Sequence, residues 1–374
     1  MDHELTMGKI RITSIIGTRP EAIKLVPVIL AARKRPDQFQ VSVVRTGQHR
    51  GLVDQLMDEF GVYADDDLRV MQSKQDLSYV LTESLRGLSE LFARQRPDWV
   101  LVQGDTMSTV AGALAGFYHH INVGHVEAGL RTGDRRSPFP EEVNRSIATR
   151  LADLHFAPTE QARRNLLLES IADEDIVVTG NTVVDALVET LGRSPSRAIS
   201  GRCRYIVLTA HRRENLGSVL HDICDGLIIL LERNQDVRAI VPMHPNPSVR
   251  DVLIRRLGGH DRIVLREALG YTEFLNALSG ASLVLTDSGG VQEECAVLEK
   301  PMLILRGHTE RPEALDGGRA ILVGTNSHRI ADVGSLLLGE LRACRAVPSL
   351  STRFGDGTAS TRILDAVLSR TRPK

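Results

Sequence analysis

Short apolar runs rich in β-branched residues alternate with helix-like segments along almost the whole 374-residue sequence. This alternation is typical of α/β proteins, in which helices join parallel strands and cover both faces of the sheet. In the first half it predicts strands at 10–16, 40–46, 98–103, 121–125, 154–157 and 176–178. It predicts helices at 20–34, 50–59, 76–95, 107–118, 140–151 and 159–169.

One stretch, LGRSPSRAISG at 191–201, is rich in Ser, Gly and Pro and is predicted to be a linker. The alternation then restarts. It predicts strands at 204–209, 238–241, 262–265, 282–286, 302–305 and 320–323, and a last helix at 359–370. A chain of this length exceeds the size at which one hydrophobic core stops growing. We therefore expect two doubly wound domains facing each other across a cleft.

The charge balance of the chain argues against a polyanionic partner. With 46 basic and 47 acidic residues the formal net charge is −1, so we expect no nucleic-acid partner. The first residues lack the apolar segment of a signal peptide, and no apolar run approaches the roughly 18–20 residues that cross a bilayer. These features predict a cytoplasmic protein that does not enter the membrane.

Cysteine and histidine spacing argues against a metal site. Four cysteines, Cys203, Cys224, Cys295 and Cys344, form no CxxC pair, and no histidines are spaced as HxH or HxxxH. We expect reduced, buried thiols and no bound metal.

Two strand-to-helix turns are suited to binding an anion. The segment TDSGGVQEE at 286–294 follows an apolar run, and its glycines Gly289 and Gly290 allow a ligand to approach the first amides of a helix beside Ser288. Near the start, GTRPE at 17–21 carries Arg19, and Lys24 lies one turn further. Together these turns suggest one anionic ligand held between two halves of the molecule.

Polar residues follow most of the other predicted strands. In an open parallel sheet, ligands bind beyond the carboxyl ends of the strands, so these residues are candidates for a site. The segments are TGQH (46–49), QGDT (103–106), HVEAG (125–129), AHRREN (210–215), MHPNP (243–247), DSGG (287–290) and RGHTER (306–311).

Three carboxylates stand out among these segments. Asp105 and Glu127 each follow an apolar strand beside a glycine, and Glu141 opens a helix after Pro140. The neighbouring Glu142 reads as a favourable partner of the helix dipole. Carboxylates gathered in one cleft push their pKa values apart, which is how acid and base roles are assigned.

Cations balance these carboxylates. Such a cluster at strand ends suits a diphosphate whose negative charge grows as it departs. The candidates are Arg19, Lys24, Arg131, Arg145, His211, Arg212, Arg213 and Arg311.

At this point the chain resembles the non-hydrolysing UDP-N-acetylglucosamine 2-epimerases over essentially its whole length. The matching stretches are GTRPEAIKLVPV (17–28), TGQHR (46–50), VQGDT (102–106), HVEAGLRTGD (125–134), SPFPEEVNR (137–145), TGNTVVDAL (179–187), TAHRRENLG (209–217), DSGGVQEE (287–294) and TERPEAL (309–315).

The resemblance implies two Rossmann-like domains in the arrangement of GT-B glycosyltransferases. They would be 1–188 plus the returning helix region 359–374, and 189–358, which would bind UDP. It implies a UDP-sugar substrate, no nicotinamide or other cofactor, and a homodimer.

The resemblance also implies roles for individual residues. Asp105, Glu127 and Glu141 would be the acid/base positions, with His211 beside them. Ser288, Gly289 and Gly290 would hold phosphate, Glu294 the ribose, and Phe274 would lie near the uracil. The remaining contacts to diphosphate and sugar would come from Arg19, Lys24, Arg131, Arg145 and Arg311.

The implied reaction inverts C-2 of the sugar. A base takes the C-2 proton as UDP leaves C-1, giving 2-acetamidoglucal and UDP, and the proton and UDP then return with the opposite configuration at C-2. Which carboxylate serves which face stays open, as does the pathway that the product would enter.

The chain departs from the family pattern at three places. It reads RGHTERPE at 306–313 where the family usually reads RDTTERPE, and it has Pro245 where HLNP is typical. Gly51 stands where a longer polar residue is common. The first change would fit a sugar with a different substituent.

Many bacterial relatives are activated by UDP-N-acetylglucosamine at a second site. By motif position this chain would build such a site from Gln48, His49, Glu141, Arg212 and His244. It lacks the polar residue at position 51 and the arginine at position 74, where it has Lys74, so we expect weak or absent activation.

Three other readings share parts of this pattern. A GT-B glycosyltransferase would use the same fold and nucleotide socket, but would need an acceptor groove and usually one base. A hydrolysing 2-epimerase would release free sugar, and a non-catalytic sensor would not need all three carboxylates.

Overall fold

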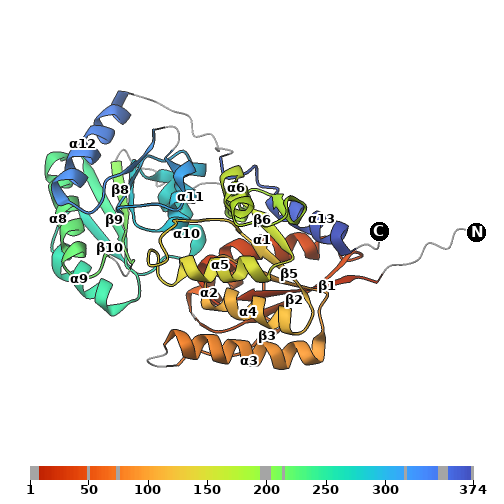
Figure 1. Ribbon diagram of the computed structural model, residues 1–374. Helices are drawn as coiled ribbons and strands as arrows, with labels where there is room; N and C mark the ends of the chain where they lie inside the picture. Colours follow the sequence, from red (N-terminus) through yellow and green to blue (C-terminus); the bar gives the residue numbers. More distant parts are fainter. Residues whose placement is uncertain are drawn as a thin grey trace, which may run out of the picture. The chain divides into compact units, whose positions relative to one another are not determined.

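The computed structural model describes residues 8–48, 51–72, 76–193, 204–212, 215–315, 318–343 and 353–371. These residues form two compact α/β units (Figure 1). The first unit comprises Met1–Glu189 and Gly355–Lys374, and the second comprises Thr190–Phe354. The domain limits expected from the sequence, at 188/189 and 358/359, lie within a few residues of these boundaries.

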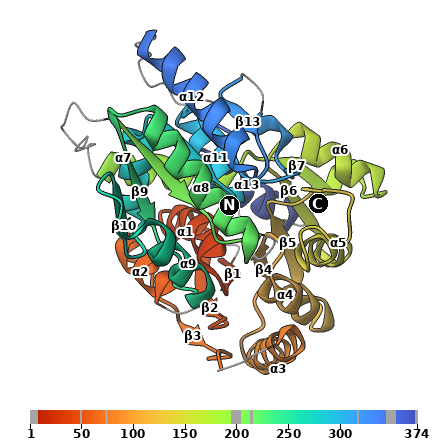
Figure 2. The same cartoon turned by 90° about the vertical axis from the view of Figure 1, so that its left-hand side faces the viewer.

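The first unit is built on a seven-stranded sheet with the order β3-β2-β1-β4-β5-β6-β7, and all its strand pairs are parallel. The strands are β1 (Ile10–Ile16), β2 (Phe39–Arg45), β3 (Asp66–Asp67), β4 (Trp99–Gln103), β5 (Asn122–Val126), β6 (Leu154–Ala157) and β7 (Ile176–Val178). Its helices are α1 (Arg19–Arg33), α2 (Leu52–Phe60), α3 (Leu77–Gln95), α4 (Met107–Tyr118), α5 (Glu141–Leu151), α6 (Glu160–Leu168), η1 (Asp173–Asp175), α7 (Thr182–Arg193) and α13 (Ala359–Thr371). Helix α3 packs beside α4 in both views (Figure 2).

The second unit is built on a six-stranded parallel sheet with the order β10-β9-β8-β11-β12-β13. Its strands are β8 (Arg204–Thr209), β9 (Val237–Pro242), β10 (Ile263–Arg266), β11 (Leu283–Thr286), β12 (Met302–Ile304) and β13 (Ala320–Leu322). Its helices are α8 (Ser218–Arg233), α9 (Pro247–Leu257), α10 (Tyr271–Gly280), α11 (Gly289–Val297), η3 (Pro312–Ala314) and α12 (Ser327–Ala343).

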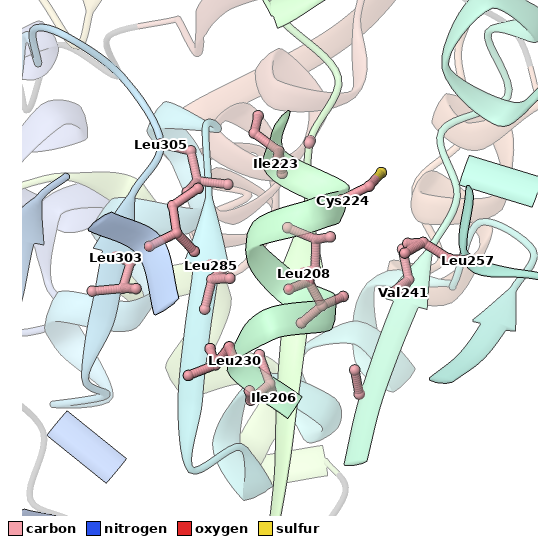
Figure 3. Packing of buried hydrophobic residues seen from close by; sticks show 14 of the residues in the cluster. Ile206, Leu208, Ile223, Cys224, Leu230, Val241, Leu257, Leu285, Leu303 and Leu305 are labelled. Carbon is pink, nitrogen blue, oxygen red and sulfur yellow. The ribbon is translucent and has the colours of Figure 1, made fainter. Parts of the chain in front are cut away.

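The central strands β4 and β11 are buried along their whole length because helices cover both faces of each sheet. In the second unit, Ile223 and Leu230 of α8 pack over Leu208 of β8 and Leu285 of β11 (Figure 3). All four side chains are fully buried. Burying a leucine or isoleucine side chain stabilises a fold by about 1.5–3 kcal/mol, so this layer is a main source of the unit's stability.

Helix starts follow from local capping chemistry. Thr18 and Glu21 form a capping box at α1, and the Thr106 hydroxyl accepts a hydrogen bond from the Thr109 amide at α4, 3.1 Å away. Each capped helix begins directly after a buried strand. The capping residues therefore decide where the chain leaves the sheet, and with it the position of the polar turns.

The first unit is completed by α13, which follows the whole second unit in the sequence. The helix packs on α1, and Thr371 Oγ1 accepts a hydrogen bond from Trp99 Nε1 of β4 at 2.7 Å. The Asp185 carboxylate accepts hydrogen bonds from the amides of Ala359 (3.3 Å) and Ser360 (2.8 Å). These contacts bind the helix to strand β4 and helix α7.

Every strand and helix range that was predicted is confirmed to within a few residues, apart from one wrong boundary. No range was predicted for β3, which is two residues long, for α7, or for α8, α9, α10 and α12 of the second unit. The predicted linker at 191–201 begins too early, because 191–193 form the end of α7, which extends an amphipathic pattern with buried Val183 and Leu187. The rest of that segment lies outside the described residues.

No helix in the described ranges is both long and apolar enough to span a membrane. Cys224 and Cys295 are buried free thiols, and burial raises the pKa of Cys224 to about 12 and also raises that of Cys295. Both are therefore protonated and unreactive at neutral pH. Cys203 and Cys344 lie outside the described residues.

Candidate active site

Each sheet has one point where its strand order reverses, between β1 and β4 in the first unit and between β8 and β11 in the second. Such a switch point opens a crevice beyond the carboxyl ends of the strands, where ligands of α/β proteins bind. The turns at the first switch point are 17–18 and 104–106, and those at the second are 210–212 and 287–288. Asp105, His211, Arg212 and Ser288 lie in these turns, and Arg19 and Gly289 directly follow two of them.

Glu127 is the most enclosed of the three candidate carboxylates. It follows β5, and its side chain is 6% exposed against 4% for Lys24 of α1, with which it forms an ion pair. Asn181 Nδ2 donates to the same carboxylate oxygen at 3.2 Å. Gln103 Nε2, at the end of β4, donates to the other oxygen. Both carboxylate oxygens are therefore bound, and the Lys24 ammonium is neutralised where water has little access.

The backbone at Glu127 is strained. Its φ of 64° lies in the left-handed region, which costs a residue with a side chain roughly 1–2 kcal/mol. Gly104 in the neighbouring turn also has a positive φ, 71°, and a Cβ built on it would lie 3.6 Å from Glu127 Oε2. The Glu127 carboxylate therefore lies against the turn that carries Asp105.

Asp105 pairs with Arg145 of α5, whose side chain is 5% exposed. Asn144 Nδ2 from the same helix donates to the Asp105 carbonyl oxygen at 2.9 Å. Two consecutive residues of α5 thus fix both the backbone and the side chain of Asp105. The Asp105 carboxylate itself remains partly exposed, at 26%, so a ligand can reach it.

Glu141 is the first residue of α5 and is half-buried. It lies one helical turn before Arg145, on the same face of the helix. Because Arg145 contacts Asp105, this face is directed toward the turn after β4. The three predicted carboxylates thus all lie in the first unit: Asp105 and Glu127 follow neighbouring strands, and Glu141 begins the helix whose Arg145 pairs with Asp105.

Glu142 does more than complement the helix dipole. Its Oε1 accepts hydrogen bonds from the amides of Thr132 (2.9 Å) and Gly133 (3.0 Å), and its Oε2 pairs with Arg145 at 3.0 Å. The residue therefore fastens the loop after β5 to α5.

Glu21 links the two turns of the first switch point. One carboxylate oxygen accepts hydrogen bonds from the amides of Gly17 (3.0 Å) and Thr18 (2.6 Å), and the other accepts from the hydroxyls of Thr106 (2.7 Å) and Thr109 (3.4 Å). Burial raises the pKa of Glu21 to about 7, although hydrogen bonds from Thr106, Thr18 and Gly17 oppose this rise. The turn before Arg19 and the turn that carries Asp105 are therefore held by one side chain.

His125 and His155 lie side by side beneath this edge, as register partners on β5 and β6. His125 Nε2 lies 2.7 Å from the Gly104 carbonyl oxygen, which can only accept, so Nε2 carries the proton. Burial lowers the pKa of each imidazole to about 4. Both rings are therefore neutral at pH 7, and His125 supports the turn next to Asp105.

The other two predicted cations of the first unit are placed differently. Arg19 is the first residue of α1 and is half-buried at the switch point. Arg131 lies in an ion pair with Glu169 of α6 (2.6 Å) and donates to Thr149 (2.9 Å). These contacts give Arg131 a role in holding α5 and α6 together.

In the second unit, Ser288 is the N-cap of α11 and makes no side-chain capping bond. A Cβ on Gly289 would lie 2.4 Å from Arg311 Nη1, so only glycine lets this guanidinium approach the start of the helix. A Cβ on Gly290 would meet no atom within 4 Å. The helix start is therefore open on one side and flanked by a cation on the other, which suits an anion.

A buried ion network positions Arg311. Arg311 donates a hydrogen bond to Glu293 at 2.5 Å. Glu310 accepts one from Arg306 at 2.7 Å and lies 3.4 Å from Arg212. The two glutamates and Arg306 are at most 4% exposed. The network fixes the loop before η3 against α11.

His211 follows β8 and lies 3.6 Å through Nδ1 from Asp287 Oδ1. Its ring stacks on that of His244, with centroids 5.1 Å apart and planes 13° apart. Glu294 is buried in the second turn of α11, and Phe274 is half-buried in α10. The sequence-predicted groups of the second unit therefore lie around α11 and the turn after β8, with Phe274 on the helix before β11.

Several residues of these sites were given no individual role from the sequence. They are Glu21, Gln103, Asn181, Asp287, Glu293 and Glu310, and each is a buried polar partner of a predicted site residue or turn. The role of Glu21 could have been found, since Thr18-x-x-Glu21 is the signature of a capping box. Gln103, Asp287 and Glu310 lie in the candidate segments that follow strands, but nothing in their spacing indicates which partners they have.

Part of the predicted second site lies outside the described residues, namely His49 and Lys74. Gln48 is described, and its side chain accepts from Ser108 Oγ at 3.1 Å in the first unit. Within the described ranges, no three His, Cys, Asp or Glu side chains are grouped to hold a metal ion.

Comparison with known proteins identifies the family of the chain. The family model of UDP-N-acetylglucosamine 2-epimerase matches residues 31–368. The Bacillus subtilis UDP-N-acetylglucosamine 2-epimerase is 44% identical over 365 residues, which are 97% of this chain and 96% of that protein.

Solved structures match over both units. The UDP-GlcNAc 2-epimerase from Neisseria meningitidis, bound to UDP-GlcNAc, superposes with a TM-score of 0.92 at 38% identity, covering 96% of this chain and 100% of that one. The S. aureus MnaA–UDP structure superposes with a TM-score of 0.88 at 40% identity, covering 96% of each chain. The chain therefore belongs to the UDP-N-acetylglucosamine 2-epimerase family.

Proposed function

We propose that the protein interconverts UDP-N-acetylglucosamine and UDP-N-acetylmannosamine by eliminating UDP and adding it back. The observation that carries this proposal is the grouping of Asp105, Glu127 and Glu141 in the first unit, with Lys24 bound to one of them and Arg145 to another. A transferase that passes the sugar to an acceptor usually needs one base, whereas inversion at C-2 needs groups that move a proton on both faces.

In this proposal the second unit holds the nucleotide. The open start of α11 at Ser288, Gly289 and Gly290, with Arg311 beside it, binds the diphosphate through amides and charge. Glu294 accepts from the ribose hydroxyls, and Phe274 lies near the uracil. His211 contacts the diphosphate or the sugar, where its proton offsets charge that grows as UDP leaves.

The first unit supplies the proton transfers. A carboxylate takes the proton from C-2, the C–H electrons form the C1=C2 bond, and the C1–O bond breaks to release UDP with its electron pair. In the reverse step a proton returns to C-2 from the opposite face as UDP attacks C-1. Lys24 and Arg145 act mainly by fixing the Glu127 and Asp105 carboxylates, since both cations are almost fully buried in these pairs.

Turnover in D₂O tests the elimination step. If the C-2 proton leaves for a carboxylate that exchanges with solvent, NMR will find deuterium at C-2 of both UDP-sugars. Full retention of the original hydrogen in the product would overturn this mechanism.

Isosteric variants test the carboxylates. We expect Asp105→Asn and Glu141→Gln each to lower kcat by about 10²-fold or more, because each keeps its size and loses its basicity. Exposed Glu90 of α3, changed to Gln, is a matched control that should keep the normal rate. Near-normal rates in both site variants would refute the assignment.

A second candidate substrate is a UDP-sugar with a different substituent. Gly307 and His308, where the chain departs from the family pattern, are exposed in a loop in which Arg306 and Glu310 are buried. An NMR time course with UDP-N-acetylglucosamine separates the cases: conversion to UDP-N-acetylmannosamine supports the main proposal, free sugar plus UDP indicates a hydrolase, and no change favours another sugar or a transferase.

A further inference from the structure

Asp287, at the end of β11, is a fully buried carboxylate with two very different oxygens. Its Oδ2 accepts three hydrogen bonds: from the amides of His211 and Arg212, each at 2.9 Å, and from Asn215 Nδ2 at 3.0 Å. These bonds fix the turn after β8 to the end of β11, the two strands that flank the switch point of the second unit. This half of the carboxylate is therefore structural.

The other oxygen, Oδ1, is also buried, and among the described residues no group donates a hydrogen bond to it. His211 Nδ1 lies 3.6 Å from this oxygen. A buried carboxylate oxygen without a donor is costly, so a movement of a few tenths of an ångström that brings Nδ1–H into hydrogen-bond range is favoured.

The surroundings of His211 set which of its nitrogens is available. Its side chain is 35% exposed, and its ring lies flat against His244. When Nδ1 is directed at Asp287, Nε2 lies at the opposite edge of the ring. Among the described residues beside the ring, the Asp287 carboxylate favours the imidazolium, and a charge on His244 or on the adjacent Arg212 opposes it.

We propose that Asp287 is a positioning residue for His211. Its Oδ1 accepts a hydrogen bond from Nδ1–H, which fixes one ring orientation, leaves Nε2 to meet the substrate, and stabilises the imidazolium. This inference rests on the role of His211 in the proposed function. In this inference Asp287, the first residue of the DSGG segment, does not contact the ligand and acts only through His211.

An asparagine at this position separates the structural role from the positioning role. The Oδ1 of an asparagine can accept the same three hydrogen bonds, so Asp287→Asn is expected to fold. Its amide group would then be directed at His211 Nδ1 and would donate to it. The histidine would have to carry its proton on Nε2, so a neutral ring of the wrong tautomer would face the ligand.

The first experiment is an NMR titration of the histidine side chains in the full-length protein, with the His211 signal assigned by its loss in His211→Ala. We expect Asp287→Asn to lower the pKa of His211 by about one unit or more and to move the proton to Nε2. The control is Asn215→Ala, which removes a donor to Oδ2 and leaves Oδ1 facing the ring, so His211 should keep its tautomer. An unchanged tautomer and pKa in Asp287→Asn would overturn the proposal.

The second experiment is kinetic. We expect Asp287→Asn to lower kcat by about 10- to 100-fold with little change in KM, and to add almost nothing to the loss in His211→Ala. An equal loss in both backgrounds would show that Asp287 does not act through His211 and would overturn the inference. Failure of the proposed function looks different: the wild-type protein would then not convert UDP-N-acetylglucosamine to UDP-N-acetylmannosamine, whatever the titration shows.

Discussion

The buried ion pair between Lys24 and Glu127 allows a test that separates charge from shape. Both side chains are almost fully enclosed, and Glu127 also accepts from Gln103 and Asn181. Glu127→Gln keeps the size, the backbone strain and an oxygen that can accept hydrogen bonds. It removes the charge that balances the Lys24 ammonium.

Leaving one partner of a buried pair without its counter-charge typically costs about 3–5 kcal/mol. With a urea dependence of about 2–3 kcal/mol per molar, the unfolding midpoint of the first unit should fall by about 1–2 M. The double variant Lys24→Met/Glu127→Gln removes both charges and should be more stable than the sum of the single effects by about 2 kcal/mol.

The chain offers a selective probe for this experiment. Trp99 is its single tryptophan and is buried in β4 of the first unit, so its fluorescence reports the unfolding of that unit. The exposed pair of Arg86 and Glu90 on α3 is the matched control, and its removal should change the midpoint little. Single effects on Lys24 and Glu127 that add to within about 0.5 kcal/mol would refute the coupling.

Three further predictions concern pH and regulation. The pKa values of His125 and His155 are about 4 in the folded protein and 6.5 in the unfolded chain, so acid favours unfolding. The free energy of unfolding should fall by up to about 3 kcal/mol for each histidine as the pH drops from 6.5 to 4. In His125→Gln, unfolding followed by Trp99 fluorescence should depend less on pH over this range. The pH dependence expected from Glu21 has the opposite sign, because its pKa is about 7 in the folded protein and 4.5 in the unfolded chain. The stability that it contributes is complete below pH 4.5 and is lost as the pH rises through 7. The difference in unfolding free energy between wild type and Glu21→Gln should therefore change between these pH values, and a constant difference would contradict the argument. Gly51 offers no side chain to a second nucleotide-sugar, so conversion of UDP-N-acetylmannosamine should proceed without added UDP-N-acetylglucosamine, and a rate that is near zero until trace activator is added would disprove this.

The elements could be predicted from the sequence because each strand is a short apolar run that ends at a polar or glycine-containing turn. The candidate site could be predicted for the same reason: parallel strands end at one edge, so Asp105 and Glu127 had to lie near each other. Strand β3 was missed because its two residues, Asp66 and Asp67, are acidic and have no strand pattern.

The pairing of side chains could not be predicted. Lys24 and Glu127 are 103 residues apart, Asp105 and Arg145 are 40 apart, and His211 and Asp287 are 76 apart. No local spacing tells which cation meets which carboxylate, since that depends on how helices pack on the sheet. The sequence could therefore not show that Arg131 pairs with Glu169 or that Arg145 pairs with Asp105.

Because α13 returns to the first unit, that unit cannot complete its fold until the whole chain has been synthesised. The helix places Ile363, Leu364 and Val367 in buried positions of the first unit. It also supplies the hydrogen-bond partners of Trp99 and Asp185, which are Thr371 and Ser360. All of the second unit is synthesised before this helix. The first unit therefore begins to emerge first but completes its fold last. The apolar surface on which α13 packs stays exposed while about 165 further residues are synthesised, and chaperones can bind this surface during that interval.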